Sequence, residues 1–112
     1  MLSDLLNDSP GHADWKRLCD RPDGGAACLF SVVFAPHFSQ DQVDAFCDAL
    51  RLFKLGYSWA GPISLVVPYD LRAMRMVWPP EIAQGTVVRF SVGLEAVADL
   101  QADIAQALRA MV

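Results

Sequence analysis

Cysteine is scarce in this sequence and follows no pairing pattern. The three cysteines, Cys19, Cys28 and Cys47, are an odd number and include no CxxC pair. A small secreted domain held together by disulfides normally carries an even and denser set. The cysteine content therefore argues against a disulfide scaffold and favours a protein of the reducing cytoplasm.

Histidine and lysine are also rare, which limits the chemistry that the chain can perform. His12 and His37 are far apart, and neither stands at metal-ligand spacing from a cysteine. The two lysines, Lys16 and Lys54, lie in no apolar pattern of the kind that prepares an amine for Schiff-base chemistry. We predict no metal site and no catalytic nucleophile or base within this chain.

Long apolar runs and an excess of positive charge are absent as well. No apolar stretch approaches the ~18–20 residues of a membrane span, and the N-terminus lacks the basic start and apolar run of a signal peptide. Nine Lys and Arg stand against thirteen Asp and Glu, a net charge of −4. We therefore expect neither a membrane nor a nucleic acid as a partner.

The chain does contain enough apolar sequence for one core. It has 112 residues, of which 54% are hydrophobic and 20% charged, so it is too apolar for a disordered segment. Residues 1–27 carry several prolines and glycines without a sustained period, which is typical of a linker or wrapping segment. We expect residues 28–112 to form a single α+β domain.

Apolar periodicity predicts the elements of this domain. Residues 29–34, 63–67 and 86–92 are rich in strand formers, and Pro68 is expected to end the second strand. A capping-box spacing and an apolar stripe predict a helix over 40–53, residues 71–77 are expected as a turn of helix or coil, and a helix is predicted from Glu95 onward. The order favours a mostly antiparallel sheet of three or more strands covered by helices. It leaves the order of the strands open.

The same patterns predict where several single residues lie. Lys54 is expected in the last turn of the first helix, where a cation complements the carbonyl end, with Gly56 as its C-cap. Cys28 and Cys47 fall in apolar patterns and are expected in the core, whereas Cys19 is expected as an exposed thiol.

Arg89 is the most informative charged residue, because of its place in the third predicted strand. Alternation puts Val88, Phe90 and Val92 on one apolar face and Arg89 on the other. On that face its guanidinium could bind a carboxylate through two parallel hydrogen bonds. The alternative is an exposed or ion-paired arginine on a solvated sheet.

The aromatic loop after the first helix is a second candidate. Tyr57, Ser58 and Trp59 precede a Gly-Pro pair, which excludes regular structure. They could offer a hydroxyl, backbone amides and an aromatic wall to a small ligand, or they could form a hydrophobic plug. Ser58 has no neighbouring His or acidic residue, so a nucleophilic triad has no local support.

Two strings carry a family resemblance: LGYSWAG at 55–61 and GTVVRFSVGLE at 85–95. Together they resemble the C-terminal part of the Cys/Met-metabolism family of pyridoxal-phosphate (PLP) enzymes, in particular its cystathionine β-lyase branch. Supporting strings follow the same order along the chain, namely PGH with WKR at 10–17, LFS at 29–31 and LFK at 52–54. The resemblance spans residues 9–112.

The resemblance implies roles for the candidate residues. Arg89 would bind the α-carboxylate of an amino-acid substrate. Ser58 would help to hold the catalytic lysine and the substrate, and Trp59 would lend a backbone amide and a wall to the carboxylate pocket. The chain departs from the family pattern at Ala60–Leu65, where Gly-Gly-x-Glu-Ser-Leu is usual, and at Ala96, where an acid is common.

The family's large domain, which carries the PLP-binding lysine, is absent from this chain, and PLP chemistry depends on it. The resemblance therefore implies a C-terminal domain that is inactive and binds no PLP alone. Its parent would be a homotetramer with active sites shared between subunits, and would cleave cystathionine by α,β-elimination to homocysteine, pyruvate and ammonia. A γ-lyase or sulfhydrylase parent, or a free-standing amino-acid-binding or oligomerisation module, are the alternatives.

Overall fold

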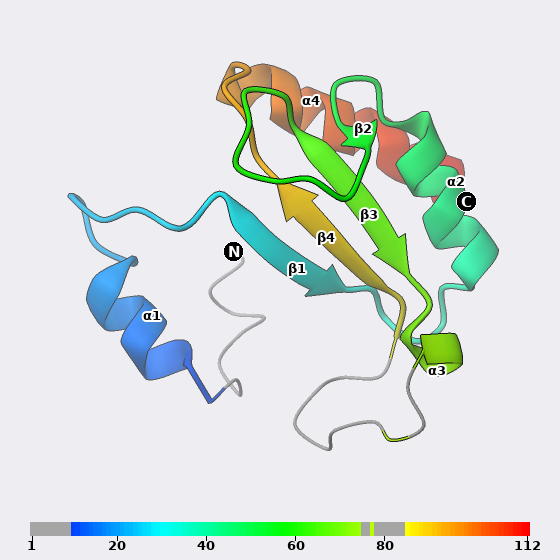
Figure 1. The fold of residues 1–112 in the computed structure, drawn as a ribbon, viewed down its shortest axis with the longest axis horizontal. Coiled ribbons are helices and arrows are strands. Elements are labelled where there is room, and N and C mark those ends of the chain that lie inside the picture. The colour runs from blue at the N-terminus through cyan, green and yellow to red at the C-terminus, as the bar shows by residue number, and fades with distance from the viewer. Residues whose placement is uncertain (1–9, 75–76, 78–84) are drawn as a thin grey trace.

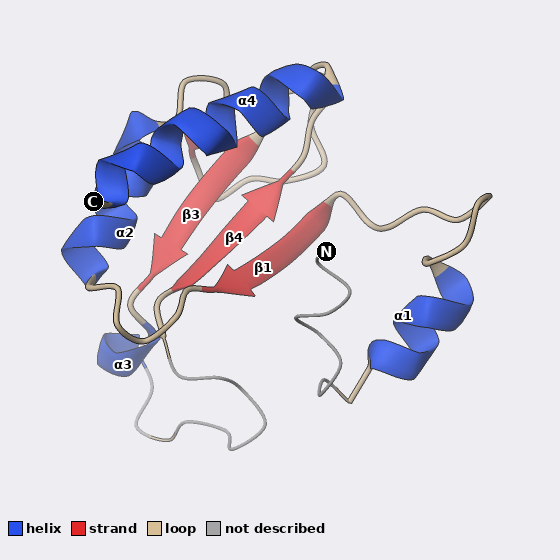
Figure 2. Ribbon diagram, turned by 180° about the vertical axis from the view of Figure 1, so that it is seen from behind, coloured by secondary structure: helices blue, strands red, loops and turns tan. Residues whose placement is uncertain are grey.

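The computed structural model describes residues 10–74, 77 and 85–112, and it shows helices packed on one face of a four-stranded sheet (Figures 1 and 2). The strands are β1 (Leu29–Val33), β2 (Lys54–Leu55), β3 (Leu65–Tyr69) and β4 (Val87–Ser91). They lie in the order β1-β4-β3-β2, with β4 antiparallel to both β1 and β3 and the short β2 parallel to β3. The predicted α+β class and mostly antiparallel sheet are confirmed.

Helices α2 (Gln40–Ala49) and α4 (Val97–Ala107) cover one face of this sheet, as Figure 2 shows. The core lies between them and includes Val43 and Phe46 of α2, Val66 of β3, and Val88 and Phe90 of β4. A 3-10 helix, Leu108–Met111, continues α4 and packs against α2. The short helix α3 (Leu71–Met74) follows β3.

The predicted helix over 40–53 begins where expected and ends early. Ser39 forms both bonds of the capping box with Gln42, but the backbone leaves the helix at Leu50. The amides of residues 51–53 donate instead to the carboxylate of Asp103 on α4, at 2.7–3.3 Å. A tertiary partner therefore outcompetes the last helical turn, although the apolar period continues through it.

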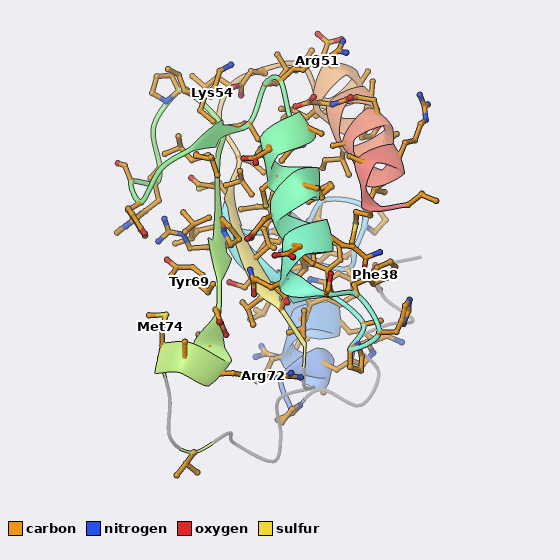
Figure 3. All side chains as sticks on the ribbon, turned by 90° about the vertical axis from the view of Figure 1, so that its right-hand side faces the viewer. Phe38, Arg51, Lys54, Tyr69, Arg72 and Met74 are labelled. Atoms are coloured by element: carbon orange, nitrogen blue, oxygen red, sulfur yellow. The ribbon has the colours of Figure 1, made fainter. Side chains whose placement is uncertain are left out.

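Lys54 and Gly56 consequently lie outside the helix, so both predictions for them were wrong. Lys54 begins β2, and its Nζ donates to the carbonyl of Arg51 at 2.6 Å. Figure 3 places Lys54 and Arg51 at the same end of the domain, far from Arg72. Gly56 follows β2, where its amide donates to the carbonyl of Val66.

Strand β3 continues through Pro68 to Tyr69, where the sequence predicted an end. Because the carbonyl of Val66 faces Gly56 on the β2 side, the nitrogen of Pro68 two residues later faces that side too. Strand β2 has already ended there, so the missing N–H of proline costs the sheet no hydrogen bond.

Helix α1 (His12–Leu18) lies in the segment expected as a linker, where the sequence predicted no helix. It buries no residue and sits away from the sheet in both views (Figures 1 and 2). Cys28 was predicted in the core but is exposed before β1, whereas Cys47 is buried in α2 as predicted. No helix among the residues that the structure describes is long and apolar enough to cross a membrane.

Candidate functional site

Strand β4 presents Arg89 on the face of the sheet that the helices leave uncovered. Its neighbours Val88 and Phe90 point into the core and are almost completely buried, which confirms the predicted alternation. Arg89 itself is half-buried and lies between Ser31 of β1 and Val67 of β3 in the register of the sheet.

The guanidinium of Arg89 contacts the aromatic loop, so the structure brings the two candidate regions together. Its Nη2 donates to the carbonyl oxygen of Tyr57 at 2.6 Å and lies 3.3 Å from that of Ser58. Among the residues that the structure describes, Nε and Nη1 of this guanidinium have no hydrogen-bond partner. Nε and Nη1 can therefore each donate a hydrogen bond to a carboxylate, whereas both bidentate edges of a guanidinium include Nη2, which the loop carbonyls engage.

The loop that carries these carbonyls lies over the uncovered face of the sheet (Figure 1). Its Ala60 amide donates to Oγ of Ser91 at 3.1 Å. Ser91 stands two residues after Arg89 on the same face, where solvent would otherwise reach it. It is only 1% exposed, because the loop covers it.

A cluster around the buried Ser64 holds the other end of the loop. Oγ of Ser64 donates to Oε2 of Glu95 at 2.7 Å and accepts from the amide of Gly93 at 2.8 Å. The amide of Ser64 donates to Oε1 of Glu95 at 2.8 Å. These bonds from the Ser64 amide and hydroxyl stabilise the charged carboxylate and lower the pKa of Glu95.

Two backbone positions fit the loop closely to β4. Ala60 has a φ of 59°, the left-handed conformation that alanine adopts only at a cost. The amide of Leu94 donates to the carbonyl of Pro62 at 2.9 Å, and a Cβ at Gly93 would collide with that carbonyl. Glycine at 93 therefore permits the contact between the loop and the end of β4.

The side chains of the loop point to solvent. Ser58 is exposed, and Tyr57 and Trp59 are 77% and 59% exposed. These rings fill no gap in the domain, which excludes the hydrophobic plug. The loop instead offers its carbonyls to Arg89 and leaves its side chains available to a partner.

Sequence reasoning did not identify Ser91, Ser64 and Glu95 as supports of the site. The alternation of β4 already put Ser91 on the face of Arg89, and that was the available signal. The contact between Ser64 and Glu95 joins residues 31 positions apart. A single sequence carries no local pattern for such a contact.

The family comparison decides the assignment that this geometry leaves open. The sequence model of the family described as "Cys/Met metabolism PLP-dependent enzyme" matches residues 4–109. The chain belongs to this family.

Individual members of the Cys/Met-metabolism family show the same relationship. A putative cystathionine beta-lyase of Rhizobium johnstonii is 41% identical over 107 residues, which cover 93% of this chain and 26% of that protein. The cystathionine beta-lyase of Salmonella typhimurium is 38% identical over 103 residues, 89% of this chain and 25% of that one. The chain thus spans about a quarter of the length of these relatives.

A solved structure supports the fold. The putative O-acetylhomoserine (thiol)-lyase of Campylobacter jejuni, which carries a pyridoxyl-lysine monophosphate, superposes with a TM-score of 0.62 and 25% identity. The match covers 94% of this chain and 22% of that protein. The α+β domain described above is therefore a domain found within PLP enzymes.

The described residues of this Cys/Met-metabolism chain do not by themselves fit a lysine-bound PLP. Both lysines are exposed, and the amine of Lys54 is engaged with the carbonyl of Arg51. Neither lies in an apolar pocket that would hold the amine of a Schiff base. What the chain offers is the guanidinium of Arg89 beside the loop.

Proposed function

We propose that this chain is the substrate-carboxylate-binding domain of a PLP-dependent carbon–sulfur lyase. The observation that carries the proposal is the contact of Arg89 with the carbonyls of Tyr57 and Ser58. It orients a guanidinium on the open face of the sheet while Nε and Nη1 remain able to donate. A planar, permanently charged fork of this kind suits the α-carboxylate of an amino acid.

Ser58 and Trp59 complete the proposed pocket. Both are exposed beside the carbonyl that Arg89 contacts, so a substrate carboxylate held by Arg89 would meet their backbone and side chains. The catalytic lysine and the groups that grip PLP would come from the large domain of the same enzyme, with cystathionine or a related sulfur amino acid as substrate. PLP supplies the electron sink for the elimination when it is bound. The isolated chain is expected to be inactive.

The reaction proposed for the intact enzyme is α,β-elimination of cystathionine to homocysteine, pyruvate and ammonia, in a cytoplasmic homotetramer. The two cystathionine beta-lyases described above favour this reaction. The thiol-lyase from Campylobacter jejuni favours a sulfhydrylase as the second candidate. Release of pyruvate from cystathionine by the intact enzyme would support β-elimination, and release of 2-oxobutyrate would favour a γ-lyase.

The carboxylate-binding role is tested by R89K in the full polypeptide that contains this chain. Lysine keeps the charge but loses the planar set of donors that can contact the loop and the carboxylate together, so the KM for the amino-acid substrate should rise about 10-fold or more. The exposed arginine of the C-terminal 3-10 helix provides the control, R109K, which should leave KM unchanged. An unchanged KM in R89K would contradict the proposal.

A further inference from the structure

Ser91 links the strand that carries Arg89 to the loop that Arg89 contacts. The two residues share the uncovered face of β4, and the hydroxyl of Ser91 accepts the amide of Ala60. We propose that Ser91 is a positioning residue for Arg89, acting through the loop that its hydroxyl holds. This inference rests on the carboxylate-binding role proposed for Arg89.

The guanidinium of Arg89 must be oriented before it can bind a carboxylate tightly. A long arginine side chain loses rotamer freedom when it binds a ligand, and this loss weakens binding unless the side chain is already oriented. The carbonyls of Tyr57 and Ser58 provide that orientation through Nη2. The orientation of the guanidinium therefore depends on the positions of those two carbonyl groups.

The placement of the carbonyls depends on Ala60. Its left-handed backbone is disfavoured for alanine, so a loop without a compensating contact would relax to another conformation. The bond from the Ala60 amide to Ser91 opposes this relaxation at Ala60 itself, whereas the bond from the Leu94 amide holds the loop at Pro62, two residues further on. Without the bond to Ser91, the carbonyls two and three residues upstream would lose their fixed position against Arg89.

The cluster of Ser64, Glu95 and Gly93 has a different effect. It fixes the end of the loop that enters β3, four residues beyond Ala60. It therefore sets where the loop ends, whereas Ser91 sets the conformation of the part that contacts Arg89. Substitution of Ser91 alone is the selective test of positioning.

The first measurement is steady-state kinetics of S91A in the full polypeptide that contains this chain. The substitution removes one oxygen atom, so the fold should persist, and KM for cystathionine should rise about 5- to 10-fold with kcat within about twofold. S91T retains the hydroxyl on a strand-compatible side chain and should restore KM. S31A is the matched control, because Ser31 pairs with Arg89 from β1 on the same face.

The second measurement is the combination of S91A with R89K. If Ser91 acts through the guanidinium fork, S91A should change KM by less than about twofold in the R89K background. An equal effect in both backgrounds, an equal effect of S31A, or a fall in stability with KM unchanged would overturn the positioning role. If R89K alone leaves KM unchanged, the carboxylate-binding role itself fails, which is a separate result.

Discussion

At the scale of single residues, the loop over the sheet shows how a local cost is offset by tertiary contacts. Ala60 adopts a left-handed backbone, which costs roughly 1 kcal/mol for a residue with a Cβ. The bond from its amide to Ser91 acts against this cost. A substitution at Ala60 should therefore change the free energy of unfolding, which can be measured without an activity assay.

A60G should stabilise the 112-residue chain by about 1 kcal/mol, because glycine adopts a positive φ without the steric cost. The free energy of unfolding in urea measures this. The matched control is A45G, since Ala45 lies in the middle of α2 and glycine there should destabilise by about 1 kcal/mol. Equal signs for the two variants would contradict the strain at Ala60.

At the scale of elements, the end of α2 depends on a residue of α4. Asp103 is buried and accepts the amides of Arg51, Leu52 and Phe53, together with the side-chain amide of Gln106. Burial raises the pKa of Asp103, but these hydrogen bonds to the charged form outweigh burial, so the net direction is downward. One carboxylate thus holds the turn between α2 and β2.

D103N should destabilise the chain by about 3 kcal/mol, because an amide group replaces an oxygen that faces buried N–H donors. Since the pKa of Asp103 is lower in the folded state, its contribution is complete above the unfolded value of about 3.9 and is lost as pH falls through the folded value. The free energy of unfolding in urea, measured from pH 7 to pH 3, should therefore fall less for D103N than for the native chain. D48N, at an exposed site on α2, should show the same pH dependence of the free energy of unfolding as the native chain.

The elements also show what the sequence could and could not predict. The start of α2, the face of β4 that enters the core and the presence of α4 follow from local patterns, namely a capping box and apolar periods. The end of α2 and the course of β3 past Pro68 depend on Asp103 and on the length of β2, which are tertiary facts. The site follows the same division. The position of Arg89 on its face was predicted, whereas its contact with the loop carbonyls needed the structure.

At the scale of the whole molecule, the hydrophobic core lies between the sheet on one side and helices α2 and α4 on the other. Helix α1 contributes no buried residue to it. We therefore propose that residues 28–112 fold as a domain without the preceding segment. Cys47 provides a probe, because burial, together with the charges of Asp44 and Asp48, raises the pKa of its thiol to about 12.

A variant that lacks residues 1–27 should keep Cys47 protected from a thiol reagent as strongly as the complete chain does. Cys28 is exposed and should react quickly in both, which provides an internal reference. Labelling followed by mass spectrometry, with and without urea, measures the difference. Rapid reaction of Cys47 in the shortened chain without urea would show that the first segment is required for folding.

Pro68 has a consequence for how the sheet can grow. On the outer side of β3, past the end of β2, the backbone offers no N–H at this position. A strand from another molecule cannot form a regular ladder there. Strand β1 forms the opposite edge and is not interrupted by proline. Intermolecular strand pairing at high protein concentration is therefore directed to β1, and charged substitutions on that strand are the ones that would suppress it.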